Sequence, residues 1–491
     1  MVLKAAYALL DAVLLPKYYT HALIAVAALV TIYTYAQGRK TNRERDLHAR
    51  IILITGAFTP LGLTLIDSLA RRGAHIIALT PDDVETGPSS VMVPLLRSTT
   101  NNENIYAEHC DLNSVSSIRA FCTGFVKGEE QRIDAIIFAH EYATIGSIFS
   151  RGSAEKDRQR QAASCSTFLL TTLLLPALLV APVERDIRLI TLINPFYAAA
   201  APLFSNKFAP SPPNAPPSSV TKSLFFTEGQ RALRTAVLMR HLQRILDALP
   251  TSSQVPRADT NTPIVPVVSD KVQRSNIVAV TVSPGMSRHD IVAPLLGADL
   301  SQRHSVSWRG LALYILLNPL FRILAKNSNS TLQSILHALF LPTPFKFLDA
   351  TAANEAESTG DAERDSEVLK PGALYTECAV VRINVPPPPT PPETDSGEAA
   401  PSEKDEKDKK SGATGSQRTK TKDDEEMGGE ALGTLVWDEY ESELKAWEEE
   451  EDRRVKEEKE KEAREAKERG VPSINVRPST PPTVDVDAAS S

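Results

Sequence analysis

The stretch from Arg50 to Gly62, RIILITGAFTPLG, has the residue types and the spacing to bind an anion. Its first part, Ile51 to Ile54, is apolar without alternation, which is typical of a parallel strand covered on both faces. Gly56 and Gly62 bracket the turn that follows. A strand, turn and helix of this kind directs free amides at an anion, most often the pyrophosphate of a dinucleotide.

Pro60 limits what this turn can do. It stands where the backbone should approach the phosphates, and it has no N–H to donate and a fixed φ. Thr59 and Pro60 are nevertheless a good N-cap and first helical residue, since proline there loses no helical hydrogen bond. The stretch therefore predicts the start of a helix and leaves nucleotide binding open.

Other residues that could do chemistry are few. His140 and Glu141 follow an apolar run and could form an acid/base pair, although two adjacent polar residues at a strand end are more often hydrogen-bonded structure. The four cysteines lie far apart without C-x-x-C spacing, so we predict no metal site, no disulfide framework and reduced thiols in a cytosol-facing domain. They are Cys110, Cys122, Cys165 and Cys378.

The elements that must position these residues alternate along the chain. Short apolar runs and helical stretches follow one another from residue 50 to 385, which predicts an α/β domain with a Rossmann-like, doubly wound parallel sheet. We expect strands at 51–54, 75–79, 104–109, 133–138, 187–193, 277–282 and 373–385, and helices at 61–72, 115–126, 157–179, 222–249, 308–324 and 332–341. Pro319 and Pro342 are expected to break the last two helices. A proline-rich insertion at 203–219 and an acidic stretch at 352–367 are expected loops.

The N-terminal residues predict a membrane anchor. Residues 18–37 match the length needed to cross a bilayer, contain no Asp, Glu, Lys or Arg, and have tyrosines at both ends. A cleaved secretory signal is the alternative, but the apolar run is long for one and no small-residue cleavage site follows. Residues 1–17 are expected to form a short helix. The basic linker 38–49 favours a cytosolic position for the bulk of the chain. Residues 308–324 could be a core helix or a membrane-surface patch.

The C-terminal residues are mostly predicted to be disordered, at 386–433 and 471–491, because their proline-rich and charged composition cannot bury enough apolar surface. Between them, residues 434–470 predict a charged amphipathic helix. Its narrow apolar seam consists of Trp437, Tyr440, Leu444 and Trp447. A seam this short is marginal alone, so we expect it to pack on the α/β domain or on a partner protein. The net charge of -7 and the lack of a basic stripe argue against nucleic-acid binding.

Together these marks resemble the short-chain dehydrogenase/reductase (SDR) superfamily over residues 50 to 385, and the layout is similar to its membrane-bound, retinol-dehydrogenase-like branch. The resemblance rests on the glycine turn, on Asp111 after the third strand, and on Ser283, Pro284 and Gly285 after the sixth. It implies that Asp111 touches the adenine and that the Pro-Gly turn borders the nicotinamide. The implied cofactor-binding positions are Thr55, Gly56, Gly62, Asp111, Ala139, Pro284 and Gly285.

The resemblance also places the superfamily's catalytic tyrosine, lysine, serine and asparagine. The stretches AASCSTFLLTTLLLP and RLITLIN put Ala163 at the asparagine position and Asn194 at the serine position. FTEGQRAL puts Phe226 at the tyrosine and Gln230 at the lysine. Phe226 has no proton to give and Gln230 has no charge to stabilise a phenolate, so we predict no catalytic residues. The S-x-x-x-K at 218–222 lies in the proline-rich loop and does not replace them.

A dinucleotide could still bind without catalysis. Thr80 and Pro81 occupy the places where an acid would select NAD or an arginine NADP. A phosphorylated ribose would therefore be poorly accommodated, and NAD(H) is favoured over NADP(H) if either binds.

We expect a membrane-anchored protein of this fold without the catalytic tetrad, serving as an interaction or scaffold module. One alternative is an NAD(P)-dependent oxidoreductase acting on a hydrophobic lipid or sterol-like alcohol or ketone, and another is a dinucleotide-sensing regulator. The layout is also similar to a fungal family of unknown function with a yeast mitochondrial member. That likeness favours the mitochondrial outer membrane over the endoplasmic reticulum.

Overall fold

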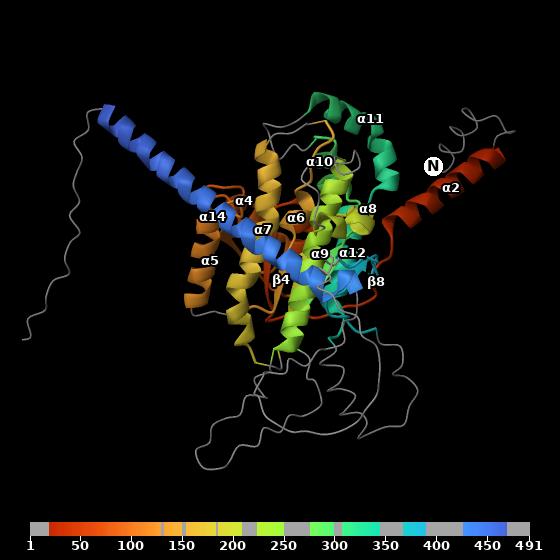
Figure 1. The fold of residues 1–491 in the computed structure, drawn as a ribbon. Helices are drawn as coiled ribbons and strands as arrows, with labels where there is room; N and C mark the ends of the chain where they lie inside the picture. Colours follow the sequence, from red (N-terminus) through yellow and green to blue (C-terminus); the bar gives the residue numbers. More distant parts are fainter. Residues whose placement is uncertain are drawn as a thin grey trace, which may run out of the picture. The chain divides into compact units, whose positions relative to one another are not determined.

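The computed structural model describes residues 19–128, 132–149, 154–182, 185–208, 223–249, 275–298, 307–343, 367–388 and 426–468. The chain divides into two compact units, residues 1–444 and 445–491. The first contains an eight-stranded sheet of order β3-β2-β1-β4-β5-β6-β7-β8. Every neighbouring pair is parallel except β7 with β8. This sheet confirms the expected Rossmann-like, doubly wound fold (Figure 1).

The strands are β1 (Ile51–Thr55), β2 (His75–Thr80), β3 (Ile105–His109), β4 (Ala135–Phe138), β5 (Ile187–Leu192), β6 (Ile277–Ser283), β7 (Leu374–Thr376) and β8 (Ala379–Val381). The helices along the sheet are α3 (Pro60–Ala70), α4 (Ser89–Thr100), α5 (Val115–Lys127), α7 (Ala154–Leu179), α9 (Leu224–Ala248) and α12 (Ser328–Phe340). The shorter helical elements are α6 (His140–Ala143), α8 (Tyr197–Ala200), η5 (Arg288–Val292) and α10 (Ala293–Leu295). The remaining long helices are α2 (Tyr19–Gln37), α11 (Trp308–Leu324) and α14 (Gly429–Glu468).

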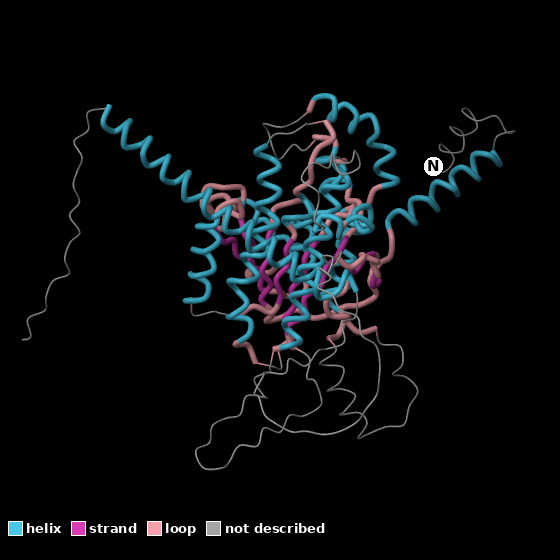
Figure 2. Tube along the Cα trace, in the orientation of Figure 1, coloured by secondary structure: helices cyan, strands magenta, loops and turns pink. Residues whose placement is uncertain are grey.

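Helices enclose the sheet, as the tube of Figure 2 shows with strands in magenta and helices in cyan. On one side α3 packs with α4 and α12, and on the other α5 packs with α7 while α9 lies on β5 and β6. The central strands β4, β5 and β6 are buried along their whole length, which explains why their sequences are apolar without alternation. The carboxyl ends of these strands carry the residues of the candidate site.

The structure differs from the sequence-based prediction at two helices. Helix α4 was not predicted, because Pro94 interrupts its apolar residues. Its first turns bury only Ser89 and Val93. Helix α11 was expected to break at Pro319 but continues through it, with the bend that a proline inside a helix produces (Figure 1).

The expected single strand at 373–385 is also wrong, because the structure has a hairpin there. Glu377 and Cys378 have φ values of 54° and 58° and form the two-residue turn between β7 and β8. Two successive residues in the left-handed region make the tight turn that matches the twist of a hairpin. Glycine and asparagine usually signal such a turn, and neither is present.

Several predicted segments lie outside the described residues. These are the N-terminal helix at 1–17, most of the proline-rich insertion, nearly all of the acidic loop at 352–367, most of the linker 386–433, and the tail 471–491. The described start of the insertion forms the short 3-10 helices η2 (Ala201–Leu203) and η3 (Ser205–Phe208).

Two of the described helices are long and apolar enough to cross a membrane. The stretch Lys156–Leu179 within α7 is mostly buried in the domain, so it is a core helix. Helix α2 is different, because none of its apolar window is buried within the protein. The structure therefore contains an apolar, uncovered N-terminal helix at the place where an anchor was expected.

The first part of α14 packs on the domain. The ring of Tyr440 stacks on Phe168 of α7 with centroids 5.4 Å apart, and Trp437 meets the same ring edge-on at 5.0 Å. Arg234 of α9 lies 4.2 Å from the Tyr440 ring centroid and pairs with Glu443 at 2.7 Å. From Lys445 the helix belongs to the second unit, where glutamates and lysines or arginines alternate on exposed faces.

Candidate functional site

The glycine turn after β1 is shaped by the protein's own packing. Gly56 has a φ of 64°, and a Cβ there would lie 2.7 Å from the backbone nitrogen of His140. A Cβ on Gly62 would lie 2.3 Å from the carbonyl oxygen of Gly56. Thr59 caps α3 by accepting a hydrogen bond from the Gly62 amide at 3.1 Å, and Pro60 is the first helical residue. The predicted helix start therefore holds in the structure.

A carboxylate of the chain itself occupies the anion-binding position of this turn. The amide of Leu61, which follows Pro60, donates to Oδ1 of Asp290 at 3.0 Å. Ser287 Oγ donates to the other oxygen, Oδ2, at 2.7 Å, and Asp290 is only 2% exposed. Burial raises the pKa of Asp290, and these hydrogen bonds oppose that effect. The end of the helix that would attract a pyrophosphate therefore already holds a buried acidic group.

The Pro-Gly turn after β6 is also filled by side chains. Tyr142 is fully buried, and its hydroxyl donates to the carbonyl oxygen of Gly285 at 2.7 Å while accepting from the Ser287 amide at 3.3 Å. Burial raises the pKa of Tyr142 well above its usual value, so the phenol stays protonated. On the other side, Lys326 Nζ donates to the carbonyl oxygen of Pro284 at 3.1 Å.

His140 is a structural residue in this arrangement. Its Nε2 lies 2.8 Å from the carbonyl oxygen of Ala163, so Nε2 carries the hydrogen. Its Nδ1 then accepts from Thr55 Oγ1 at 2.7 Å. Burial lowers the pKa of His140 to about 4, so the ring is neutral at physiological pH. A ring with both nitrogens bonded to the protein has no free position for a substrate proton.

Glu141 lies in a second buried group of polar side chains. Thr235 Oγ1 of α9 is 2.9 Å from one carboxyl oxygen of Glu141 and 3.1 Å from the other. The same threonine is 3.2 Å from the hydroxyl of Tyr440, which in turn lies 2.9 Å from Ser164 Oγ of α7. Burial raises the pKa of Glu141. His140 and Glu141 therefore bond to different groups and do not form an acid/base pair; each fixes a different part of the core.

The four positions that the SDR resemblance assigns to catalysis lack acid/base side chains. Ala163 and Phe226 are buried apolar residues. Asn194 is buried, with Nδ2 donating to the carbonyl oxygen of Glu228 at 3.1 Å and Oδ1 accepting from the Phe196 amide at 3.1 Å. Gln230 is half-buried and lines a cavity. The amide of Asn194 thus holds the β5–α8 loop against α9.

The remaining predicted cofactor positions are held by local contacts. Thr55 Oγ1 accepts from the Ala139 amide at 3.2 Å besides donating to His140. Asp111 Oδ1 accepts from both the backbone and the side-chain nitrogen of Asn113, at 2.9 Å and 3.1 Å. Thr80, at the end of β2, is buried and accepts from the Asp82 amide at 3.3 Å. The strand ends do bring Thr55, Gly56, Ala139 and the Pro-Gly turn together, but around protein side chains.

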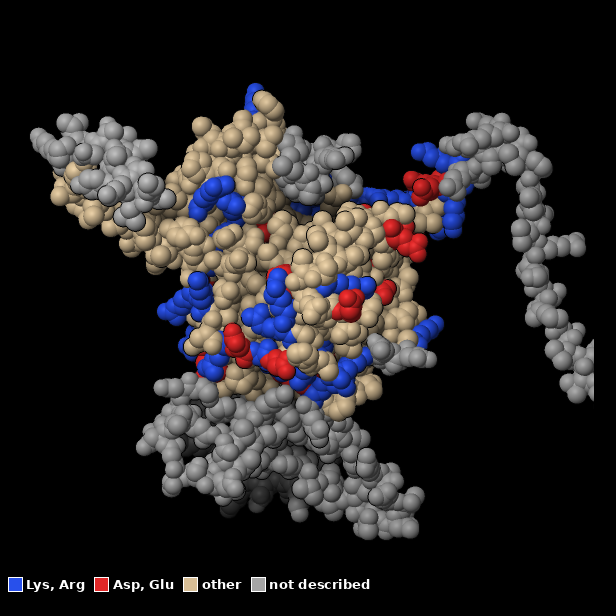
Figure 3. All heavy atoms as spheres, turned by 180° about the vertical axis from the view of Figure 1, so that it is seen from behind, with Lys and Arg blue, Asp and Glu red and all other residues tan. Residues whose placement is uncertain are grey.

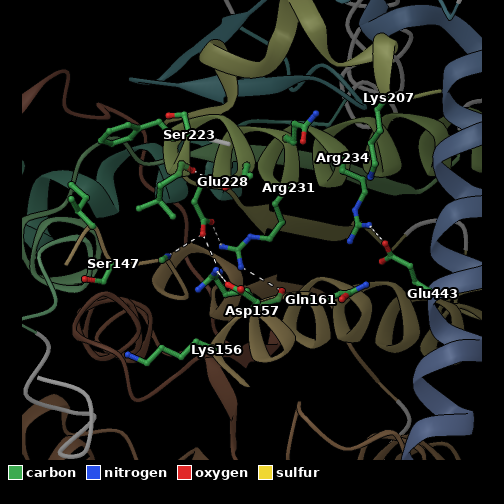
Figure 4. A pocket seen from close by; sticks show the side chains of 17 residues that line it. Ser147, Lys156, Asp157, Gln161, Lys207, Ser223, Glu228, Arg231, Arg234 and Glu443 are labelled. Atoms are coloured by element: carbon green, nitrogen blue, oxygen red, sulfur yellow. Dashed lines mark hydrogen bonds and ion pairs between the residues drawn. The ribbon is translucent and has the colours of Figure 1, made fainter. Parts of the chain in front are cut away.

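A cavity of about 750 Å³ opens beside this region (Figure 4). Glu228 lines this cavity. Its carboxylate accepts from the Gly146 amide at 3.0 Å and pairs with Arg160 at 3.1 Å and with Arg231 at 2.9 Å. Arg234 and Glu443 form the next pair along the same wall, as the dashed lines in Figure 4 show. Gln230 also faces this cavity, so the position of the expected lysine is accessible. Most charged groups of the cavity wall pair with one another, namely Asp157 with Arg160, Glu228 with Arg160 and Arg231, and Arg234 with Glu443.

In the described site, the protein's own side chains occupy positions where a dinucleotide would bind. Among the described residues, no group of three or more His, Cys, Asp or Glu side chains could hold a metal ion. A dinucleotide would have to displace Asp290 from the Leu61 amide, where Pro60 supplies no N–H in its place. It would also meet Tyr142 against the Pro-Gly turn.

Sequence reasoning missed Asp290 and Tyr142. A signal for Asp290 was present, since Ser287 and Asp290 have the S-x-x-D spacing of a capping box, and the Asp290 amide does donate to Ser287 Oγ at 3.3 Å. That spacing predicts a local cap, whereas the bond to Leu61 spans 229 positions of sequence. Tyr142 had no distinguishing signal.

Comparison with known proteins places the chain among oxidoreductase relatives. No family model matches it. It is 24% identical over 343 residues to an uncharacterized oxidoreductase of Schizosaccharomyces pombe, covering 69% of this chain and 82% of that protein. It is 28% identical over 339 residues to an uncharacterized oxidoreductase of Saccharomyces cerevisiae, covering 67% of this chain and 77% of that protein. A 110-residue stretch is 33% identical to human retinol dehydrogenase 13, covering 22% of this chain and 32% of that protein.

Among solved structures, a short chain dehydrogenase from Salmonella enterica matches with 14% identity and a TM-score of 0.36, covering 59% of this chain and 99% of that chain. An NADH-dependent reductase in complex with NAD matches with 14% identity and a TM-score of 0.33, covering 49% of this chain and 80% of that chain.

The sheet order, the two turns at its carboxyl edge and the relatives that match over most of their length agree on one class of protein. These findings support the resemblance to the short-chain dehydrogenase/reductase superfamily that the sequence predicted. The two fungal proteins are similar to this chain over about two thirds of its length, and the retinol dehydrogenase over a shorter stretch.

Proposed function

We propose that this chain is a membrane-anchored SDR-fold protein that serves as a non-catalytic interaction or scaffold module. The proposal rests mainly on the hydrogen bond from the Leu61 amide to Asp290, because a carboxyl group of the protein then occupies the amide that would bind a phosphate. Phe226 and Gln230 support it, since neither side chain can transfer the proton that SDR chemistry needs.

The proposal includes a place in the cell. Helix α2 is the single span, the bulk of the chain faces the cytosol, and the mitochondrial outer membrane is favoured over the endoplasmic reticulum. The basic residues after α2 and the uncovered apolar surface of α2 support the orientation and the span. Fractionation of cells that express the full chain, with markers for both membranes, tests the organelle.

A protein partner is proposed for the charged helix at 434–470. Residues 437–443 of that helix contact α7 and α9, so the part of it beyond Leu444 is the part that we assign to a partner. Its exposed glutamates, lysines and arginines suit a partner surface of mixed charge.

The alternative function is an NAD(P)-dependent oxidoreductase acting on a hydrophobic lipid or sterol-like alcohol or ketone. Two fungal relatives that match over most of their length are named oxidoreductases, and this favours the alternative. In that case NAD(H) is the expected cofactor, since Thr80 and Pro81 offer no cation for a 2′-phosphate. A dinucleotide-sensing regulator would bind NAD(H) without turning over a substrate.

A titration of the purified full chain in detergent with NADH and with NADPH, followed by calorimetry, separates these functions. We expect no saturable binding up to millimolar concentration. Asp290→Ala is the matched variant, because it frees the Leu61 amide without adding a group. Binding by the variant alone would support the role of Asp290. Micromolar binding by the unaltered chain would contradict the proposal, and turnover would then decide between enzyme and sensor.

A further inference from the structure

We propose that a cavity at the base of α2 binds the phosphate of an anionic phospholipid. The cavity has a volume of about 320 Å³ and lies where α2 meets the end of α11 and the start of η5. Its cationic lining comes from Arg288, Arg322 and Lys326, and α2 contributes Tyr33 and Gln37. Among the residues that the structure describes, no aspartate or glutamate lines it.

Hydrogen bonds fix the walls of this cavity. The backbone nitrogen of Arg288 donates to the carbonyl oxygen of Lys326 at 3.2 Å, and the backbone nitrogen of Lys326 donates to the carbonyl oxygen of Met286 at 2.9 Å. Gln37 closes the third side, since Nε2 donates to the carbonyl oxygen of Ala325 at 3.2 Å and Oε1 accepts from the Asn327 amide at 3.1 Å. The last residue of α2 is therefore tied to the segment that carries the cations.

Within the described residues, two of the three cations have no acidic partner. Lys326 pairs with Glu377 at 2.8 Å. In the described part of the chain no carboxylate pairs with Arg288 or Arg322, and the Arg288 guanidinium contacts only His289 Nε2, at 2.8 Å. Guanidinium groups bind phosphate oxygens through paired N–H groups in a fixed fork. The cavity thus presents two such groups to an anion.

The surroundings of the cavity identify the source of the phosphate as a lipid. Helix α11 packs beside α2, and most of its exposed residues are apolar: Trp308, Ile315 and Leu316 are 80%, 64% and 73% exposed. Figure 3 shows the largely uncharged surface of these helices, with basic side chains where they meet the domain. A phospholipid places acyl chains beside its phosphate, so an apolar surface continuous with a basic cavity fits one molecule of it. Free phosphate would use only the cavity.

This inference rests on the membrane part of the proposed function, and not on the absence of catalysis. If α2 crosses a bilayer, its last residue, Gln37, comes to the cytosolic surface at the depth of the lipid phosphates. The bonds from Gln37 to Ala325 and Asn327 then place Arg288 and Arg322 at that depth as well.

The test is a titration of the full chain in a neutral detergent with dihexanoyl phosphatidic acid, followed by calorimetry. Dihexanoyl phosphatidylcholine and inorganic phosphate are titrated separately. The variant Arg288→Gln/Arg322→Gln removes the two unpaired guanidinium groups, and Arg309→Gln removes an exposed arginine near the other end of α11. Arg322→Gln alone, at an exposed position, serves if the double variant does not fold.

We expect saturable binding of the anionic lipid by the unaltered chain and by Arg309→Gln. We expect affinity to fall about tenfold or more for each of the two arginines replaced. Equal binding of phosphatidylcholine, or an equal loss with Arg309→Gln, would overturn the proposal. Inorganic phosphate binding as tightly as the lipid would overturn the assignment to a lipid. Release of the chain from membranes by alkaline carbonate would contradict the anchor separately, since the titration in detergent does not depend on a span.

Discussion

At the scale of single residues, Asp290 decides how the glycine turn is used. Its carboxyl group is buried, accepts from Leu61 and Ser287, and lies at the positive end of α3. A bound phosphate would need the same amide and would bring a second negative charge close to the first. The free amide of the turn is therefore already bound by the protein's own carboxyl group.

Replacing Asp290 should destabilise the domain. Asp290→Ala leaves the buried Leu61 amide and Ser287 hydroxyl without their acceptor, which costs about 1–3 kcal/mol of unfolding free energy. Asp290→Asn can still accept from Leu61, so its loss should be smaller. Denaturant unfolding of the full chain measures both. An alanine variant as stable as the original would mean that the bond to Leu61 contributes nothing.

His140 should make the domain sensitive to acid. Its pKa is about 4 in the folded chain against an ordinary value of 6.5. Between those pH values the unfolded chain binds a proton that the folded chain does not, so stability falls as the pH is lowered through this window. A shift of that size corresponds to roughly 3 kcal/mol.

The variant His140→Gln isolates this contribution. Glutamine cannot titrate, so its unfolding free energy should depend less on pH between 4 and 6.5 than that of the original chain. Glu141 and Asp290, whose raised pKa values act in the opposite direction, remain in both proteins and cancel from the difference. His109→Gln, at an exposed position, is the control. Parallel pH profiles for His140→Gln and the original would refute the assignment of a neutral buried ring.

Sequence reasoning at this scale succeeded where the interaction is local. Thr59 and Pro60 predicted the cap of α3, because a cap depends on residues three apart. Sequence reasoning could not find Asp290, because its bond partner is distant in sequence and any buried aspartate could equally have capped its own helix.

At the scale of elements, the C-terminal helix α14 closes the outer face of α7 and α9. Its Tyr440 hydroxyl joins Ser164 and Thr235, and Glu443 lies 3.5 Å from the thiol of Cys165. Burial raises the pKa of the Cys165 thiol to about 12. The reactivity of the Cys165 thiol therefore measures how often α14 leaves the surface of α7.

The variant Tyr440→Phe should loosen this helix. It removes one hydroxyl and leaves Ser164 and Thr235 without that partner, a loss of about 1–2 kcal/mol. The population with α14 undocked, and with it the alkylation rate of Cys165, should rise about tenfold. Peptide-resolved mass spectrometry measures the rate, with Cys110 as an internal reference and Ser442→Ala, at an exposed position, as the control. An unchanged rate at Cys165 would argue that other contacts hold the helix.

The order of elements could be predicted because apolar runs and helical periods alternate regularly. The errors lie where backbone geometry departs from its usual residues. Glu377 and Cys378 form a hairpin turn without glycine, and Pro319 sits within a helix whose bend accommodates it. Neither effect can be read from propensities alone.

At the scale of the whole first unit, α2 and α11 were each expected from hydrophobicity, but their adjacency was not. Gln37, the last residue of α2, bonds to Ala325 and Asn327, which directly follow α11. These bonds span 288 and 290 positions of sequence. Such contacts depend on how the sheet brings the β6 loop and the N-terminal segment to one place. If α2 is the proposed span, these contacts bring the domain surface beside it to the membrane as well.

The anchor itself gives the last prediction. Ala28→Asp/Leu29→Asp places two carboxylates near the centre of α2, at a cost of about 2.5–3.5 kcal/mol each in a bilayer. We expect the original chain to stay in the membrane pellet after alkaline carbonate and the variant to appear in the supernatant. Val91→Asp/Leu95→Asp is the matched control, since it puts the same charges on apolar residues of α4 that are 72% and 60% exposed.

The same membranes reveal the orientation. Protease added to intact organelles should remove a tag placed after Ser491, because the basic residues that follow α2 favour a cytosolic domain. A protected tag would reverse the topology. If alkaline carbonate released the original chain, α2 would instead rest on a protein surface. The exposed apolar residues of α2 and α11 would then form a protein interface.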